Sequence, residues 1–192
     1  MSDLNMKKIA FILGCTFVAV NLQAKVIDVT DYGAVSDTTV LSTDAIQKAI
    51  NDCSRSGGGT VMIPAGHYKI GTLVMKSHVN LHLEQGATLY GSTNLQDYLK
   101  LKSSYVSFRT QNETLQLIYG DSIQDVKISG SGTIDGQGKG FPKLSMNDEG
   151  MTRPHLLRFI QSTDITVEGI TLKNSGCWMQ HYLACDRVNI HG

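Results

Sequence analysis

A six-residue pattern recurs three times in the second half of the chain. Residues 125–130 read DVKISG, residues 164–169 read DITVEG and residues 187–192 read RVNIHG. Each copy alternates two apolar side chains with polar ones and then reaches a glycine, as a short strand does before a turn. The last two copies lie 23 positions apart, and a polar insertion at 137–154 accounts for the longer spacing of the first two. A strand that returns in phase after about two dozen residues indicates a solenoid of stacked coils.

Further short strands are expected upstream of the repeat, several of them separated by glycines: 26–29, 60–63, 73–75, 79–83 and 87–90. Because no helical pattern lies between these later strands, we expect an all-β chain folded as a right-handed parallel β-helix. An antiparallel sandwich would have strands of the same length. The repeat keeps its phase, however, and most junctions lack the Asn-Gly or Asp-Gly dipeptides of hairpins, which favours the β-helix.

One helix is expected after the first strand. Ser42, Thr43 and Asp44 offer an N-cap, and Gly57 begins a run of three glycines that ends the pattern. One helical face between them is apolar: Ala45, Ile46, Ala49, Ile50 and Cys53. Because a solenoid needs a cap over its first coil, we expect this helix, at 44–53, to cover the N-terminal end.

The N-terminus has the three parts of a secretory signal peptide. Lys7 and Lys8 precede an apolar run at 9–20, and a small residue, Ala24, stands at the expected cleavage point. The run is too short to span a membrane. Cys15 invites a lipoprotein interpretation, but the apolar run continues past it. We therefore expect a signal peptide at 1–24 and a secreted protein, periplasmic or extracellular, whose coils occupy 25–192.

The charge balance excludes two classes of partner. The 192 residues carry 17 Lys and Arg against 17 Asp and Glu, a net charge of zero. Binding to nucleic acid or to an anionic membrane surface needs a basic surplus, so neither partner is expected. The length fits a single domain.

Cysteine and histidine spacing predicts no metal site and no cofactor. Cys53, Cys177 and Cys185 remain after signal removal, and an odd count argues against a disulfide framework. Cys177 and Cys185 could pair, but buried thiols are the favoured interpretation, with Cys185 in the interior. The sequence contains no CxxC and no HExxH, so a zinc site is not expected.

Several segments resemble known pectin-degrading proteins. The opening of the mature chain, at 31–34, 57–61 and 63–66, resembles that of the pectin-degrading β-helix superfamily. The later segments resemble glycoside hydrolase family 28, which contains polygalacturonases and rhamnogalacturonases. These are LHLEQGATLYGS at 81–92, ISGSGTIDGQG at 128–138, RPHLL at 153–157, and GITLKNS at 169–175 followed by Trp178 and His181. The resemblance covers nearly all of the mature chain and implies hydrolysis of α-galacturonosyl bonds in pectic polysaccharide, with inversion. Such chemistry needs two carboxyl groups, one acidic and one basic.

The catalytic elements of that family are not found in this sequence. They are an Asn-Thr-Asp-Gly segment, an Asp-Asp pair, a Gly-His-Gly turn and an Arg-x-Lys pair. The only adjacent acids are Asp148 and Glu149, and the only Gly-His is Gly66-His67, in an early turn. No residue of the chain is therefore assigned as a catalytic acid.

The position of those elements in the family predicts where the acids would be. In the family they follow the segment that contains Trp178 and His181, whereas this sequence ends at Gly192. We therefore expect the family acids beyond Gly192. The chain is then the N-terminal portion of a longer enzyme, truncated at the C-terminal end of its β-helix and inactive alone.

Four residues are the candidate substrate contacts. Trp178 could stack on a sugar ring and His181 could hydrogen-bond to it. The alternative is a Trp packed between coils beside a satisfied histidine. Arg153 with His155 could bind a uronate carboxylate, the alternative being a structural ion pair.

Four other polar residues are given mainly structural interpretations. Asp135 follows a strand and is expected to cap backbone N–H groups of a turn. Asn174 could belong to an internal asparagine ladder, and Asp148 with Glu149 is expected to be solvated.

Three classes of function remain open from the sequence. The first is a pectin glycosidase, present here as a fragment. The second is a non-catalytic β-helix that binds polysaccharide through an aromatic and basic groove. The third, a lyase, would need a calcium-binding cluster of acids that is not visible. The expected partner is a pectic polysaccharide; a complete chain would be a monomer, whereas a truncated one would self-associate through its open last coil.

Overall fold

The computed structural model describes residues 25–110, 112–142 and 152–192. The expected signal peptide and the pair Asp148 and Glu149 lie outside the described residues. In chain order the elements, with η denoting a short 3₁₀ helix, are β1 (Lys25–Asp28), η1 (Val29–Tyr32), α1 (Thr43–Arg55), β2 (Gly59–Ile63), β3 (Gly66–Ile70), β4 (Leu73–Val74), β5 (Val79–Leu83), β6 (Ala87–Gly91), η2 (Leu95–Asp97), β7 (Gln116–Asp121), β8 (Gln124–Gly130), β9 (Thr133–Asp135), η3 (Gly138–Gly140), β10 (His155–Ile160), β11 (Thr163–Glu168), β12 (Thr171–Lys173), β13 (Gln180–Leu183) and β14 (Asp186–His191).

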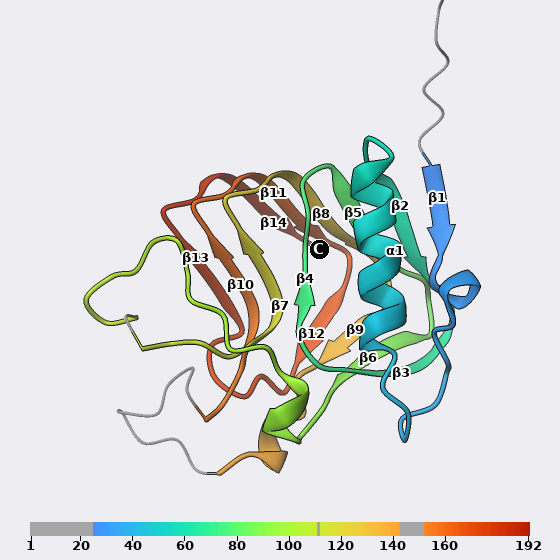
Figure 1. Ribbon diagram of the computed structural model, residues 1–192, viewed down its shortest axis with the longest axis horizontal. Coiled ribbons are helices and arrows are strands. Elements are labelled where there is room, and N and C mark those ends of the chain that lie inside the picture. The colour runs from blue at the N-terminus through green and yellow to red at the C-terminus, as the bar shows by residue number, and fades with distance from the viewer. Residues whose placement is uncertain (1–24, 111, 143–151) are drawn as a thin grey trace, which may run out of the picture.

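The strands form three parallel sheets that wind into a right-handed β-helix, as expected (Figure 1). One sheet has the order β1-β2-β5-β8-β11-β14, the second β13-β10-β7-β4 and the third β12-β9-β6-β3. Each coil therefore contributes one short strand to each sheet, and the sequence repeat marks the strands of the first sheet.

The three copies of the repeat stack in register. Ile165 of β11 lies between Val126 of β8 and Val188 of β14. Leu81 of β5 pairs with Ile128, and both side chains are fully buried. The apolar positions of the repeat thus form columns inside the solenoid, which is how neighbouring coils share one core.

Helix α1 covers the N-terminal end of the solenoid (Figure 1) and contacts η1, β1, β2, β4 and β5. Its buried side chains are Ile46, Ala49, Ile50 and Cys53, the face expected from the sequence. The helix begins one residue before the predicted start and ends two residues after the predicted end.

Ser42 occupies the N-cap position, as expected, but its side chain makes no hydrogen bond to the first turn of the helix. The hydroxyl of Ser42 bonds to the backbone N–H and carbonyl of Val35, not to the first turn of the helix. Thr43 Oγ1 accepts a hydrogen bond from the N–H of Gly71. Both residues therefore tie the start of the helix to neighbouring loops.

Two other expectations about the strands need correction. Gly66 and His67 begin strand β3 and do not lie in a turn, because His67 pairs with Thr88 of the next coil. Strands β3, β7, β10, β12 and β13 were not predicted; in β7 and β10 nearly all side chains are buried, so they show no alternation.

One corner of the solenoid repeats its backbone conformation from coil to coil. It joins the sheet of β7, β10 and β13 to the sheet of β8, β11 and β14. Two residues at each of the last three turns of this corner have φ between 44° and 55°: Ser122 and Asp125, Gln161 and Asp164, Ala184 and Arg187. Arg187 also bridges to Asp164 of the previous coil at 2.6 Å.

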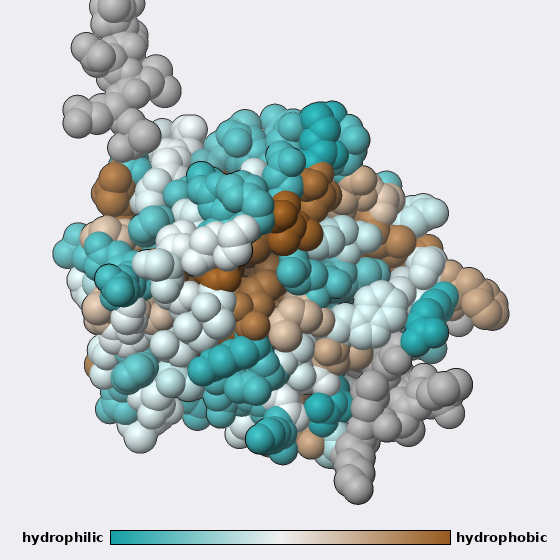
Figure 2. All heavy atoms as spheres, turned by 180° about the vertical axis from the view of Figure 1, so that it is seen from behind, coloured by the Kyte–Doolittle hydropathy of each residue, from teal (hydrophilic) through white to brown (hydrophobic). Residues whose placement is uncertain are grey.

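Seen from behind, the surface is mostly polar, with apolar side chains gathered near the middle of the view (Figure 2). No helix in the described part of the chain is long and apolar enough to cross a membrane.

Candidate functional site

A buried polar cluster lies on the outer face of the sheet β13-β10-β7-β4. In β10, Leu157 and Phe159 point into the apolar core, so Arg158 between them points outward. Arg158 pairs in register with His181 of β13. The long connection from β6 to β7 crosses this face and brings Glu113 onto it.

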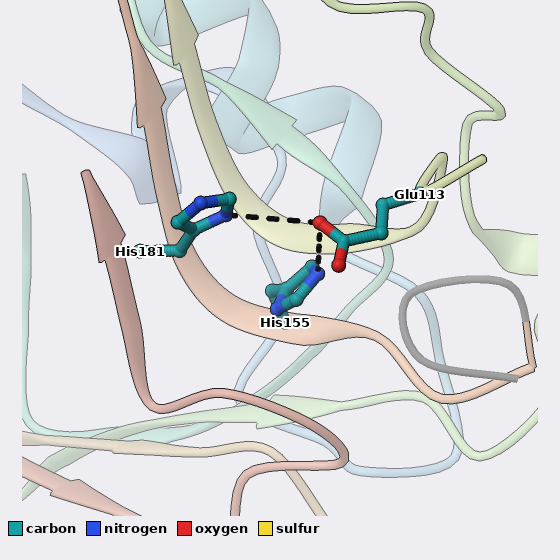
Figure 3. Close-up of side chains that lie close together, drawn as sticks. All are labelled: Glu113, His155 and His181. Atoms are coloured by element: carbon teal, nitrogen blue, oxygen red, sulfur yellow. Dashed lines mark ion pairs between the residues drawn. The ribbon is translucent and has the colours of Figure 1, made fainter. Parts of the chain in front are cut away.

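Glu113, His155 and His181 point toward one another (Figure 3), and their exposed fractions are 4%, 0% and 7%. The carboxylate atom Oε2 of Glu113 lies 3.2 Å from His155 Nε2 and 3.8 Å from His181 Nδ1. Arg158, fully buried, places Nη2 3.4 Å from the same oxygen and donates from Nη1 to the Glu113 backbone carbonyl at 2.9 Å. Four ionisable side chains thus share one buried site.

Few of these atoms make an aligned hydrogen bond. Among the described residues, both carboxylate oxygens of Glu113, both ring nitrogens of His155 and Nδ1 of His181 have no hydrogen-bond partner. Buried polar atoms in folded proteins are nearly always satisfied by protein, water or an ion. The cluster therefore has the capacity to bind a further polar species.

The charges of the cluster are set by burial and by the neighbours. Burial opposes ionisation of Glu113, but His155, Arg158 and His181 outweigh it and hold the pKa of Glu113 below its usual value. Burial, with Arg158 and His155 beside it, lowers the pKa of His181 to about 4. At neutral pH the carboxylate is ionised and the His181 ring is neutral, so its nitrogen lone pair is available.

Trp178 forms the rim of the cluster toward solvent. Its half-buried ring meets His181 and His155 edge-to-face, with centroids 4.9 and 5.9 Å apart. The guanidinium carbon of Arg109, an exposed residue, lies 5.5 Å from the centroid of the Trp178 ring. An aromatic ring with an arginine over it is a surface suited to an acidic sugar.

The structure brings together three of the four predicted contact residues. Trp178, His155 and His181 meet, but both histidines lie behind the indole and away from solvent. The contacts of Arg153 within the described part of the chain are to backbone carbonyls and not to these three side chains. Glu113 was missed because it is a single acid in a long connection without any sequence pattern.

Gly192 marks the point beyond which the family acids are expected. It follows β14, which belongs to a different sheet from the strands that carry the cluster. It is exposed and has φ of 81°. The position of the acids beyond this residue stays a prediction, because the described residues end there.

Arg153 ties three backbone segments together. Its Nε donates to the Gly176 carbonyl at 2.5 Å, Nη1 donates to Phe141 at 3.0 Å and Nη2 donates to Gly138 at 2.9 Å. It also contacts the carbonyl of Pro142. These contacts favour a structural role for Arg153. They are hydrogen bonds to backbone carbonyls, whereas the structural alternative expected from the sequence was an ion pair.

Asp135 caps a turn, as predicted. Its Oδ1 accepts from the N–H of Gln137 at 3.0 Å. Asn174 Nδ2 donates to both carboxylate oxygens, at 3.0 and 3.1 Å. Asn174 is exposed and lies in a left-handed turn, so it is not part of an internal ladder.

Two expectations from the sequence concern the cysteines and metal binding. Cys53, Cys177 and Cys185 form no disulfide among the described residues, but only Cys53 is buried; Cys177 and Cys185 are partly exposed, so the expectation of buried thiols holds for Cys53 alone. The ligand atoms of Glu113, His155 and His181, in contrast, all lie within 4.8 Å of one another and form a group that could hold a metal ion. Sequence spacing could not reveal this group, because its members come from three different segments.

Comparisons with known proteins agree with the fold. Residues 53–192 match the family model described as Glycosyl hydrolases family 28. A probable polygalacturonase of Vitis vinifera is 31% identical over 92% of this chain, and an exo-poly-alpha-D-galacturonosidase of Dickeya chrysanthemi is 38% identical over 78% of it. The chain spans only 38% and 26% of the length of these two relatives. The structure of a family 28 exopolygalacturonase of Yersinia enterocolitica superposes with a TM-score of 0.74 at 24% identity, over 88% of this chain and 38% of that one.

Proposed function

Since the chain belongs to glycosyl hydrolase family 28, we propose that it acts on pectic polysaccharide as part of a secreted, inverting polygalacturonase. The match of residues 53–192 to the family carries this proposal. The probable polygalacturonase and the exo-poly-alpha-D-galacturonosidase among its relatives support it.

Within this proposal the described residues hold substrate and do not supply the acid and base. Inverting enzymes keep two carboxyl groups about 6.5–9.5 Å apart so that a water fits between them and the sugar. The carboxylate of Glu113 is buried behind Trp178 and so is withdrawn from substrate. We assign the pair of catalytic acids to family elements that would follow Gly192.

Trp178 is the proposed sugar contact. Its ring offers an apolar surface for the C–H groups of a pyranose, and the guanidinium of Arg109, over the ring at 5.5 Å from its centroid, supplies a positive charge for a uronate carboxylate. His155 and His181 are positioning residues, because they pack edge-on against the indole and fix its plane.

Binding and turnover of polygalacturonate by the purified chain test the proposal together. We expect retarded migration in a gel that contains polygalacturonate, and no release of reducing ends. Trp178→Ala should abolish the retardation. Tyr90→Ala is the matched control, because Tyr90 packs against His67 on a different sheet.

Each other result contradicts one part of the proposal. New reducing ends from pure material would show that the described chain has its own catalytic acids. An unsaturated product would indicate a lyase. Retardation that Trp178→Ala leaves unchanged would refute the assigned contact, and absence of any retardation would refute substrate binding by this chain.

Self-association through β14 is a further expectation. In the described structure β14 pairs with β11 on one edge, and Ile190 is 51% exposed. An unpaired strand edge with exposed apolar side chains is a template for another chain. Ile190→Lys should shift the protein toward monomer in size-exclusion chromatography, and a wild type that is already monomeric would contradict this.

A further inference from the structure

The cluster of Glu113, His155 and His181 has the composition of a transition-metal site. Two imidazole nitrogens and one carboxylate oxygen converge from the β6–β7 connection, from β10 and from β13 (Figure 3). Imidazole ligands suit zinc, iron, nickel and copper, whereas calcium and magnesium prefer oxygen ligands only. Two histidines and one glutamate form the protein ligands of several zinc centres, with a water in the fourth position.

The distances fit an ion of this size. Ligands about 2.0–2.2 Å from a tetrahedral zinc lie about 3.4 Å from one another. Glu113 Oε2 is 3.2 Å from His155 Nε2 and 3.8 Å from His181 Nδ1. All three ligand atoms lie within 4.8 Å of one another, so small side-chain rotations complete the site.

Three of the unsatisfied atoms in the cluster are ones that an ion would use, whereas the unsatisfied Nε and Nη2 of Arg158 are donors that bind no metal. Glu113 Oε2, His155 Nε2 and His181 Nδ1 are buried and have no hydrogen-bond partner among the described residues. A buried polar atom without a partner destabilises the fold by roughly 1–3 kcal/mol. One ion would satisfy all three atoms at once.

Arg158 is the main objection, since its guanidinium lies 3.4 Å from the same carboxylate. A carboxylate has two oxygens, however, and ligating carboxylates are themselves usually hydrogen-bonded by a second layer of residues. Asp121 also acts on the charge of Arg158 and accepts a hydrogen bond from Tyr119, which pairs in register with Arg158. Glu113 remains the largest charge acting on Arg158, so a bound ion would share this carboxylate with the guanidinium.

We propose that Glu113, His155 and His181 bind one divalent transition-metal ion, for which zinc has the best-fitting chemistry. The ion links the β6–β7 connection to two strands of the sheet behind Trp178. Its role is structural, because the ligands are buried beneath the rim. This inference is independent of the proposed function, and its test needs no catalytic activity.

Zinc binding by the untagged full chain tests the proposal. The protein is stripped with a chelator, dialysed and titrated with zinc by calorimetry, and thermal unfolding is followed in parallel. We expect one zinc per chain and a higher Tm that a chelator reverses, with no effect of calcium. Cobalt substituted for zinc should give the visible absorption bands of a low-coordinate site with nitrogen and oxygen ligands.

Variants locate the ion. His181→Ala and Glu113→Gln should each lower zinc affinity at least about tenfold, the size of effect known even for groups behind the ligands. His67→Ala and His191→Ala, both at exposed positions, are matched controls and should leave binding unchanged. Wild-type protein is measured directly, so the test does not depend on the folding of any variant.

Two results would overturn the proposal. One is a wild-type chain that binds no zinc at stoichiometric amounts, which would leave water as the species that satisfies the cluster. The other is binding that survives both ligand variants or disappears in a control.

Discussion

The turn between Asp135 and Asn174 allows one interaction to be measured across two coils. Asp135 is 3% exposed, and the single amide group of Asn174 donates to both of its oxygens, at 3.0 and 3.1 Å. Other partners of the carboxylate are the backbone N–H and the side chain of Gln137, and the Nζ of Lys173, at 3.5 Å on a half-exposed side chain. Asn174→Ala therefore removes a main partner of a buried charge.

The expected loss of stability has two parts. A hydrogen bond to a charged group contributes about 1.5–3 kcal/mol, and we count the shared amide once, at about 2 kcal/mol. Asn174 has φ of 51°, a conformation that costs Ala about 1 kcal/mol. The sum is about 3 kcal/mol, which in a domain of this size lowers Tm by roughly 6–12 °C.

A double-mutant cycle with Asp135→Asn separates the two parts. The backbone strain of Asn174→Ala is the same in both backgrounds and cancels, so the coupling free energy reports the hydrogen bond. Urea unfolding at neutral pH should give a coupling of at least about 1 kcal/mol. A coupling within about 0.5 kcal/mol of zero would refute the reasoning.

The same coupling should depend on pH. Burial alone raises the pKa of Asp135, but the hydrogen bonds from Gln137 and Asn174 and the charge of Lys173 outweigh burial and leave this pKa lowered. A lowered folded pKa means stability that is present above the unfolded value of about 3.9 and lost as the pH falls through the folded value. The effect of Asn174→Ala should therefore shrink in acid, and an effect that grows there would contradict this assignment.

Three further predictions concern packing and thiols. Gly130→Ala should destabilise the fold by at least about 2 kcal/mol, because φ is 112° and a Cβ would overlap the carbonyl oxygen of Leu83 in the neighbouring coil; wild-type stability in urea would contradict this. Arg153→Lys should lower Tm but leave polygalacturonate binding unchanged, because lysine lacks the fork that reaches several carbonyls at once; gel retardation measures the second part. Cys53 and Cys185 should react slowly with a thiol reagent until the chain is unfolded, because burial raises the pKa of both; a disulfide found by mass spectrometry would refute the assignment of free thiols.

The coil architecture could be predicted because each coil contributes a copy of the same short sequence pattern. The copies at 125–130, 164–169 and 187–192 stack as neighbouring strands, since alternation and phase are properties of local sequence. Helix α1 was predicted because its apolar face is also a property of local sequence. Strands β7 and β10 were missed, because a strand buried on both faces has no alternation to detect.

The site was predictable only in part. Trp178, His155 and His181 drew attention by their chemistry, but their burial depends on the connection that covers them. Glu113 reaches the cluster because the β6–β7 connection crosses the sheet, a long-range arrangement without a local signal. The contacts of Arg153 are long-range in the same way, since they join backbone segments on either side of it.

The repeating left-handed corner bears on the order in which the chain folds. Each coil finds its strand partners in the coil before it, as β11 does in β8 and β14 does in β11. Ala184 and Arg187 adopt a strained φ that an isolated coil would seldom hold. A finished coil, however, supplies the backbone partners that stabilise the next corner. A strand that joins a formed neighbouring coil closes a loop of one coil only, so its pairing is less non-local than that of strands in most other β folds.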